Sequence, residues 1–330
     1  MTDPSPFAVL RMLAGGYCVS SCLHTVAALG VADHLDDVPK TAAELASAVG
    51  ADAGALHRVL RLLAAHGVFE SRESAFGHSA ASRMLRTDHP QSMRCYAQMF
   101  GLPPFWDAAG QLEHAVRTGR KVGDQVTEGG LWAYLATHPE ANAIFNATMS
   151  SKANANIAGI IAAYDFSGLP MIGDIGGGRG HLLKAVLAAA PGARGMLFDL
   201  PHVIDDAGLT ASERLELRSG DFFKDDLPSC DAYVLMEVLH DWSDDESIVL
   251  LRAIRKAAVR GARLLVIEEM LSAGSEPDWA KVLDITMLVL IGGQQRTPEE
   301  YAGLFAQAGF SFKREVQTGT GMSILEAVAA

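Results

Sequence analysis

The chain has few cysteines, and none of them has a metal-binding spacing. Its 330 residues include only Cys18, Cys22, Cys95 and Cys230, with no C-x-x-C pair among them. Scattered cysteines of this kind are typical of reduced thiols, so we expect a cytoplasmic protein without a metal site.

Long apolar runs and an excess of positive charge are also missing. No apolar run reaches ~18 residues, and no basic stretch leads into an apolar segment with a cleavage site, so we expect neither a membrane span nor a secretion signal. The 27 basic and 39 acidic residues give a net charge of −12, which argues against nucleic acid as the main partner. A hydrophobic content of 49% without low-complexity tracts indicates a folded globular protein.

The sequence pattern changes from helical to alternating strand and helix near residue 165. We expect a helical, winged-helix-like domain over residues 1–100, a helical linker over 101–165 and an α/β domain over 166–330. Over residues 90–165, helices are expected around residues 93–100, 105–117, 131–138 and 141–164. Their aromatic and Met side chains either line a pocket or fill an ordinary core.

The first domain begins with an apolar helical pattern over residues 5–35, which is either buried in its own core or packed on another subunit. A capping box at Thr41 and Glu44 starts a short helix, and a second helix over 53–66 precedes a hairpin over 68–78. Such units often bind DNA. We favour protein contacts here, because the chain is acidic and the second helix offers only three polar side chains for reading bases, His57, Arg58 and Arg61.

From residue 169 onward the pattern predicts a doubly wound α/β sheet. Strands are expected at 171–175, 195–199, 215–219, 232–238, 262–268, 310–315 and 322–328, with helices at 180–190, 201–207, 243–259 and 298–308. Ligands bind such sheets beyond the carboxyl ends of the strands, so the residues that end each strand are the candidate site.

A glycine-rich turn, Asp-Ile-Gly-Gly-Gly-Arg-Gly from Asp174 to Gly180, follows the first of these strands. Glycines there let backbone N–H groups approach a ligand at a helix N-terminus. The carboxylate before them repels a pyrophosphate but suits a cationic ligand. S-adenosylmethionine (SAM), with its amino group and sulfonium, is such a ligand.

Acidic and aromatic residues end the next two strands. Asp199 lies about 20 residues beyond the glycine turn, where a carboxylate can bind ribose hydroxyls, and we favour this role over a loop Asp or a helix cap. Asp221 and Phe222 either bind and cover an adenine or are a turn Asp beside a core Phe, and the sequence supports both interpretations equally.

His240 follows the fourth strand of the series, where it is a candidate general base. Neighbouring strands are about 4.8 Å apart, so we expect Glu268, at the end of the fifth strand, to reach its ring and fix the tautomer. Glu269 is expected at the surface. Residues 282–291 are expected to form a helix over a pocket, and Thr297 and Glu300 a second capping box.

Together these residues resemble the plant-type, cation-independent O-methyltransferases and their bacterial natural-product relatives. The resemblance covers nearly the whole chain and depends on the order and spacing of five motifs: Asp174–Gly180, Phe198–Pro201, Gly220–Phe222, His240–Trp242 and Gly292–Thr297. It implies a class I methyltransferase, Rossmann-like domain behind a winged-helix-like dimerisation domain, and a homodimer. It also implies methyl transfer from SAM to a hydroxyl of a small aromatic acceptor, with S-adenosylhomocysteine (SAH) as product.

The resemblance also implies a role for individual residues. His240 would be the base, supported by Glu268 and Gln295. The cofactor would contact Asp174, Gly176, Gly178, Asp199, Leu200, Asp221, Phe222 and Met236. The acceptor would contact Phe145, Asn146, Met149, Asp241, Trp242, Asp284, Met287 and Ile291.

Two positions depart from the family pattern. Many members have Glu where this chain has Gln295, and plant members have Lys where it has Met236. Gln295 can hydrogen-bond but adds no charge, so it favours an imidazolium less than Glu does. Met236 removes a cofactor contact or shifts it elsewhere.

Two other functions stay open from the sequence alone. Relatives that keep the SAM fold but act as hydroxylases, decarboxylases or pericyclases are one, although the retained His240 argues against it. A DNA-binding regulator is the other, and the acidic charge speaks against that. The acceptor itself is not identified, beyond a flat, phenolic or polyketide-like molecule suggested by family analogy.

Overall fold

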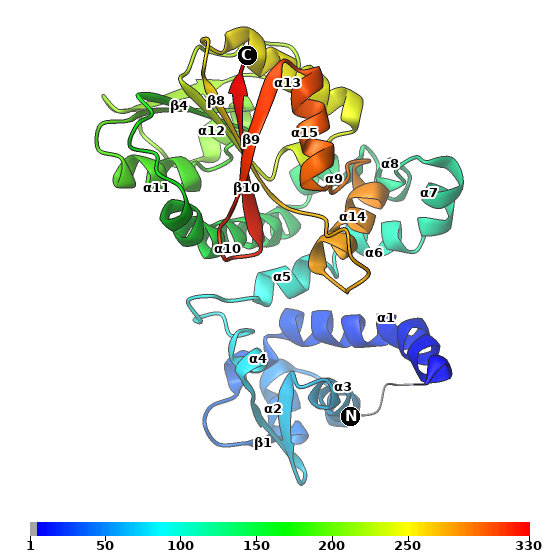
Figure 1. The fold of residues 1–330 in the computed structure, drawn as a ribbon. Coiled ribbons are helices and arrows are strands. Elements are labelled where there is room, and N and C mark those ends of the chain that lie inside the picture. Colours follow the sequence, from blue (N-terminus) through cyan, green and yellow to red (C-terminus); the bar gives the residue numbers. More distant parts are fainter. Residues whose placement is uncertain (1–4) are drawn as a thin grey trace. The chain divides into compact units, whose positions relative to one another are not determined.

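The structure is a computed structural model that describes residues 5–330. The chain forms two compact units: Met1–Asp107 with Trp132–Ser151, and Ala108–Leu131 with Lys152–Ala330. The helices and strands are labelled in Figure 1. The long helix α10 (Pro139–Ala163) belongs to the first unit up to Ser151 and to the second from Lys152 onward.

The first unit is mostly helical. Its elements are α1 (Pro6–Leu29), the 3-10 turn η1 (Val31–His34), β1 (Lys40–Thr41), α2 (Ala42–Val49), α3 (Ala53–Ala65), β2 (Phe69–Arg72), β3 (Ala75–His78), α4 (Ala80–Arg83), α5 (Arg94–Met99), α6 (Pro103–Ala109) and α9 (Gly130–Thr137). The strands form a small antiparallel sheet in the order β1-β3-β2. The predicted capping box is present, since Thr41 and Glu44 each accept the other's backbone N–H.

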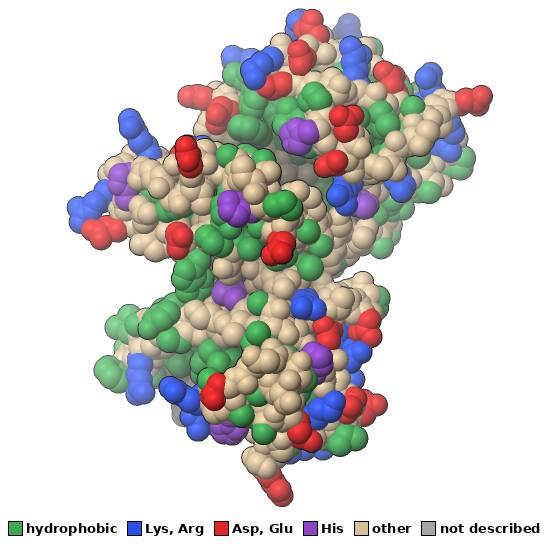
Figure 2. Space-filling model, turned by 180° about the vertical axis from the view of Figure 1, so that it is seen from behind, with side chains coloured by type: hydrophobic (Ala, Val, Ile, Leu, Met, Phe, Trp, Pro, Cys, Tyr) green, Lys and Arg blue, Asp and Glu red, His purple; other side chains and the backbone are tan. Residues whose placement is uncertain are grey.

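Helix α1 is unusual because much of its apolar surface is exposed. Phe7, Leu10 and Leu13 are 75%, 69% and 74% exposed. Figure 2 shows hydrophobic side chains on the surface of the first unit. By length and composition alone, α1 is also long and apolar enough to cross a membrane. An apolar surface of this kind marks an interaction site.

The expectation of one helix over residues 105–117 is wrong. The structure has α6, which ends at Ala109, and a separate helix, α7 (Leu112–Thr118). The break falls at Gly110 and Gln111, where the Gln111 N–H bonds the Ala108 carbonyl in a tight turn. Glycine is a poor helix former, so it ends α6 at a point that the apolar periodicity does not mark.

The second unit is built on a seven-stranded sheet in the order β6-β5-β4-β7-β8-β10-β9. The strands are β4 (Met171–Ile175), β5 (Arg194–Asp199), β6 (Leu215–Ser219), β7 (Ala232–Met236), β8 (Arg263–Glu269), β9 (Phe310–Gln317) and β10 (Met322–Ala329). Every predicted strand is present, with its ends shifted by two residues or fewer. β4 to β8 pair in parallel, whereas β10 pairs antiparallel with both β8 and β9.

Helices cover both faces of this sheet. They are α11 (His181–Ala189), α12 (Pro201–Asp206), α13 (Asp244–Ala257) and α15 (Pro298–Gln307), with the end of α10. Leu250 of α13 and Phe305 of α15 belong to the core on one face, and Ile160 of α10 and Leu182 of α11 to the core on the other. The result is a three-layer α/β domain, as predicted.

Three further helices complete the second unit: α7, α8 (Gly123–Val126) and α14 (Trp279–Leu290). The Val122 N–H bonds the Val289 carbonyl at 2.9 Å, and a Cβ on Gly123 would lie 2.1 Å from the Leu290 carbonyl oxygen. Gly123 therefore lets the segment before α8 pack directly on the end of α14.

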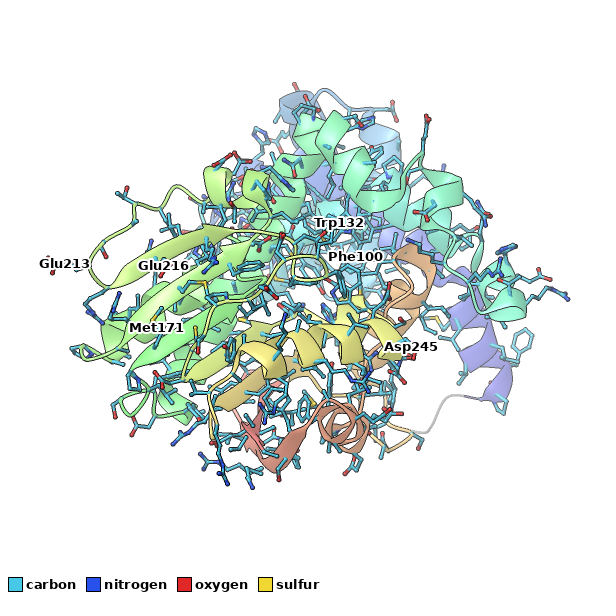
Figure 3. All side chains as sticks on the ribbon, turned by 90° about the horizontal axis from the view of Figure 1, so that it is seen from above. Phe100, Trp132, Met171, Glu213, Glu216 and Asp245 are labelled. Atoms are coloured by element: carbon cyan, nitrogen blue, oxygen red, sulfur yellow. The ribbon has the colours of Figure 1, made fainter. Side chains whose placement is uncertain are left out.

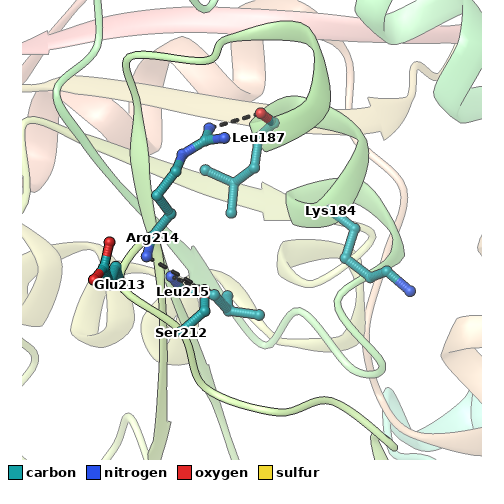
Figure 4. Close-up of a pocket in the computed structure, with 6 residues that line it drawn as sticks. All are labelled: Lys184, Leu187, Ser212, Glu213, Arg214 and Leu215. Atoms are coloured by element: carbon teal, nitrogen blue, oxygen red, sulfur yellow. Dashed lines mark hydrogen bonds between the residues drawn. The ribbon is translucent and has the colours of Figure 1, made fainter.

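A surface depression near the start of β6 lies away from the carboxyl ends of the strands (Figure 4). Arg214 in its wall donates to the carbonyls of Leu187, Ala190 and Ala193 at 2.7 to 3.0 Å. These carbonyls lie at and beyond the end of α11, where intrahelical partners are lacking. The depression is thus explained by helix capping.

Candidate active site

The carboxyl ends of the parallel strands carry most of the predicted site residues of the second unit. In Figure 3, Met171 marks the amino end of β4 at the left, and Asp245, near the start of α13, lies at the right, toward the other end of the domain. The glycine turn after β4 has left-handed backbone at Gly176, Gly178 and Gly180, with φ of 68°, 57° and 66°. This conformation favours glycine because it has no Cβ.

Asp174 is the most deeply buried acid of the turn. It is 1% exposed, and neither carboxyl oxygen forms a hydrogen bond of good geometry, although the nearby Leu183 N–H partly offsets the effect of burial on its pKa. Burial, followed by the nearby Asp199 carboxylate, raises the pKa of Asp174 to about 7. A buried carboxyl without a partner is costly, so this position fits a ligand that brings hydrogen-bond donors or positive charge.

Asp199 ends β5 and binds the glycine turn directly. Its Oδ2 accepts the Gly178 N–H at 2.8 Å, and its Oδ1 accepts the Leu200 N–H at 2.7 Å. Burial raises the pKa of Asp199. Each oxygen retains a second lone pair, so the carboxylate can order the turn and still accept from a ribose.

Phe222, beyond the end of β6, lies next to the glycine turn. A Cβ on Gly176 would be 3.1 Å from Val238 and 3.7 Å from the Phe222 ring, so the residues that follow β4, β6 and β7 meet there. Asp221 accepts from the Phe223 N–H at 2.9 Å and from Lys224, which lowers the pKa of Asp221. Asp221 therefore orders a local turn, and Phe222 lies beside it.

His240 lies in a short 3-10 turn, η2 (Leu239–Asp241), after β7, and its side chain is 8% exposed. Its Nδ1 is 3.3 Å from Glu268 Oε2 and 2.7 Å from the Gln295 amide nitrogen, whereas Nε2 is 3.4 Å from Asp241 Oδ1. Burial lowers the pKa of His240 to about 4. The imidazole is therefore neutral at pH 7 and has a nitrogen free to take a proton.

Glu268 lies beside the His240 ring, as predicted, and also holds the backbone of the turn. Its Oε1 accepts the N–H groups of Val238, Leu239 and His240 at 3.1, 3.0 and 3.4 Å. The side chain is fully buried, and burial raises its pKa well above the ordinary value. One carboxyl group thus holds the peptide segment through Oε1 and lies beside the ring through Oε2.

Gln295 reaches the same ring nitrogen from the loop before α15. Its backbone N–H donates to Asp284 Oδ1 at 2.9 Å, and its Oε1 has no hydrogen-bond partner. A half-turn of the amide would let Oε1 accept the Nδ1–H of His240 and leave Nε2 with its lone pair. Asp284, predicted to contact the acceptor, is seen here to order the Gln295 loop.

Arg296 is a residue whose role the sequence did not indicate. It is 1% exposed and donates to the Leu239 and Trp242 carbonyls at 3.0 and 2.8 Å and to Asp244 at 2.9 Å. It therefore clamps the segment that carries His240. The only sequence signal was its place next to Gln295 in a recognised motif.

A second feature that the sequence did not indicate is an ion pair between Lys152 of α10 and Glu237, the residue after β7. The two are 85 positions apart in the chain, so no local pattern connects them.

The remaining predicted acceptor residues fall in both units. Asp241, Trp242, Met287 and Ile291 belong to the second unit, and Met287 is 9% exposed on α14. The others, Phe145, Asn146 and Met149, lie on the part of α10 that belongs to the first unit. Over residues 5–330, no group of three or more His, Cys, Asp or Glu side chains could hold a metal ion.

Two family models match the chain: an O-methyltransferase domain over residues 109–311 and an O-methyltransferase dimerisation domain over residues 12–88. The chain belongs to the O-methyltransferase family. It is 40% identical to phenazine O-methyltransferase PhzM of Lysobacter antibioticus, over 97% of this chain and 95% of that protein. It is 37% identical to a mitomycin biosynthesis 6-O-methyltransferase of Streptomyces lavendulae, over 91% of this chain and 87% of the relative.

Among solved structures, CalO1, a methyltransferase in calicheamicin biosynthesis with SAH bound, matches with a TM-score of 0.88 and 35% identity over 100% of both chains. The fold is that of class I methyltransferases, with a dimerisation domain before it. The chain is therefore a SAM-dependent O-methyltransferase, with SAM as cofactor and SAH as product. The buried Asp174 carboxyl and the left-handed glycine turn, with free space at Gly178, fit that cofactor.

Proposed function

We propose that this chain methylates a hydroxyl group of a small aromatic acceptor and that His240 is the general base. The observation that carries the proposal is the buried, neutral imidazole at the strand ends, with Nδ1 facing Glu268 and Gln295. Partners on Nδ1 leave Nε2 to remove the acceptor proton.

Residues at different strand ends would bind different parts of SAM. Asp174, Gly176 and Gly178 would bind the amino-acid part of SAM, with Asp199 and Leu200 at the ribose. Asp221 and Phe222 would contact the adenine, with Met236 close to them. When bound, SAM supplies an electrophilic methyl group on a sulfonium. Glu268 and Gln295 hold the imidazole. Methyl transfer consumes the sulfonium cation and the incipient oxyanion of the acceptor, so the buried setting of the ring favours the reaction.

An aromatic acceptor is supported by the names of relatives. Besides the phenazine and mitomycin enzymes, the chain is 35% identical to a 2,7-dihydroxy-5-methyl-1-naphthoate 7-O-methyltransferase and 33% identical to a 3-amino-4-hydroxybenzoate 4-O-methyltransferase. The acceptor would contact Asp241, Trp242, Met287 and Ile291, with Phe145, Asn146 and Met149 from α10. Asp284 would act through Gln295.

The dimerisation domain supports a homodimer, and we propose that the exposed apolar face of α1 forms part of its interface. We also propose a dimerisation domain over residues 1–100, an acceptor-binding helical linker over 101–165 and a catalytic domain over 166–330.

A cytoplasmic location is supported by four free cysteines. The residues of the first unit that resemble a winged helix are assigned to protein contacts rather than DNA.

The test combines an acceptor screen with one substitution. Methyl-labelled SAM is incubated with aromatic hydroxyl compounds, and the best acceptor is then used with His240→Ala. Turnover should fall by a factor on the order of 10²–10⁴ while SAM binding, measured by calorimetry, is unchanged. The matched control is His66→Ala, an exposed histidine at the end of α3.

Full turnover by His240→Ala would contradict the assignment of the base. Tight SAM binding by the unaltered protein, without label transfer to any acceptor, would instead favour the function of a non-methylating relative. This is the second candidate function, because Gln295 stands where many family members have a carboxylate.

A further inference from the structure

A buried ion pair joins α10 to the end of β7. The Lys152 Nζ donates to Glu237 Oε1, and the two side chains are only 16% and 15% exposed. Burial alone would lower the pKa of Lys152, but Glu237, with smaller contributions from Glu269 and Glu268, outweighs burial and raises the pKa of the lysine. Glu237 lies between β7 and η2, the turn that carries His240. Lys152 therefore binds the segment that leads into that turn.

The backbone of Glu237 is held in a conformation that a side chain disfavours. Its φ is 55°, and over residues 5–330 only one other residue that is not glycine, Glu73 in the β2–β3 turn, has a positive φ. The Glu237 N–H also donates to the Ile267 carbonyl of β8 at 3.0 Å. A left-handed backbone at such a residue persists only where the surroundings hold it, and it is common at functional sites.

The ion pair also determines the balance of charge at the base. Arg296 donates to the carbonyls of Leu239 and Trp242. The cation that pairs with Glu237 is Lys152, from α10. Glu237 raises the pKa of His240, whereas Lys152 and Arg296 lower it, after the larger effect of burial. The charged or titratable groups that face the His240 turn or its ion pair are Glu237, Lys152, Asp241, Asp244, Glu268, Glu269, Arg296 and Tyr301.

We propose that Lys152 and Glu237 are positioning residues for methyl transfer: their ion pair fixes the left-handed link after β7 and thereby the place of His240. This inference depends on His240 being the base, as proposed above. Neither residue touches the reacting atoms in this role, and both act through the turn. Val238 carries the effect toward the glycine turn, since its side chain lies against Gly176.

The test uses the full-length protein in the labelled-SAM assay with four variants. They are Lys152→Met, Glu237→Gln, the charge-exchanged double variant Lys152→Glu with Glu237→Lys, and the control Lys256→Met. The control removes the lysine of an exposed pair on α13, where Lys256 and Asp226 are 74% and 84% exposed. For each variant kcat and KM are measured against pH, and the unfolding temperature is recorded.

Each single variant should lower kcat by a factor on the order of ten or more, because the base is displaced from its attack geometry. The acidic limb of kcat should move in opposite directions: to higher pH in Lys152→Met, where Glu237 is left unopposed, and to lower pH in Glu237→Gln. General damage to the fold would not produce opposite shifts. The exchanged pair should regain the unfolding temperature and part of kcat, and the control should match the unaltered protein.

Two results would overturn the inference. Equal or absent pH shifts in the two single variants would show that the pair does not act on His240. A higher KM for SAM or acceptor at unchanged kcat in Lys152→Met would make the lysine a ligand contact instead. His240→Ala is run in the same assay: if it stays fully active, the proposed base is wrong, whereas an inactive His240→Ala beside fully active pair variants rejects the ion-pair role alone.

Discussion

At the scale of single residues, Asp174 shows how a binding site stores unfavourable energy. Its carboxyl is buried without a hydrogen-bond partner, and its pKa is raised from 3.8 to about 7 in the folded protein. The unfolded chain has no such shift, so the folded state holds the proton more tightly. Without SAM, the free energy of unfolding should therefore fall as pH rises from about 4 to about 7, and stay low above that.

Asp174→Asn should remove this pH dependence. At pH 8 the variant should be more stable than the unaltered protein without SAM, by on the order of 2–4 kcal/mol, because a pKa difference of one unit corresponds to about 1.4 kcal/mol. At pH 4 the difference should nearly vanish, and SAM affinity should drop. Urea unfolding at the two pH values measures the first effect and calorimetry the second. A larger gain at pH 4 than at pH 8 would have the wrong sign for a raised pKa.

At the scale of elements, the sheet places the site and the η2 turn completes it. Three groups hold that turn: Glu268 accepts its N–H groups, Arg296 donates to its carbonyls, and Gly293 lies against it. A Cβ on Gly293 would come within 2.1 Å of the His240 carbonyl oxygen. The base is therefore fixed from β8 and from the loop before α15 together.

Arg296→Lys should weaken this clamp. A lysine cannot bond the Leu239 and Trp242 carbonyls and Asp244 in the fixed fork geometry of a guanidinium. We expect a loss on the order of 2–4 kcal/mol in the free energy of unfolding and a lower kcat. Denaturant unfolding and turnover check this, with Arg218→Lys on the exposed face of β6 as control. Equal stability of the two variants would show that the clamp is unimportant.

At the scale of the whole molecule, the exposed apolar face of α1 is the proposed dimer interface. Glutamate at Leu10 and Leu13, which are 69% and 74% exposed, should abolish the dimer, because burying two carboxylates without partners outweighs the apolar contact. Light scattering after gel filtration measures the mass. Val249→Glu, an exposed apolar position on α13, is the matched control and should leave the mass unchanged. A dimer that survives both α1 substitutions would place the interface elsewhere.

The local features of this fold follow from the sequence. Thr41 and Thr297 start their helices through side chains three residues away, so the capping boxes are visible in a short window. The same is true of the apolar runs that become β4 to β8 and of the glycines after β4. Because parallel strands bring their carboxyl ends to one edge, this order alone brought Asp174, Asp199 and His240 into one candidate site.

The tertiary structure decided what depends on distant partners. The antiparallel placement of β10 between β8 and β9, the pairing of Lys152 with Glu237 and the Arg296 clamp join segments that no local period connects. The break between α6 and α7 falls at Gly110 and Gln111, a position that the apolar period does not mark. Sequence by itself determined the family, the cofactor and the order of the strand ends, because these depend on local chemistry. Only the folded chain decided how His240 is held, because its partners Glu268 and Gln295 come from β8 and from the loop before α15.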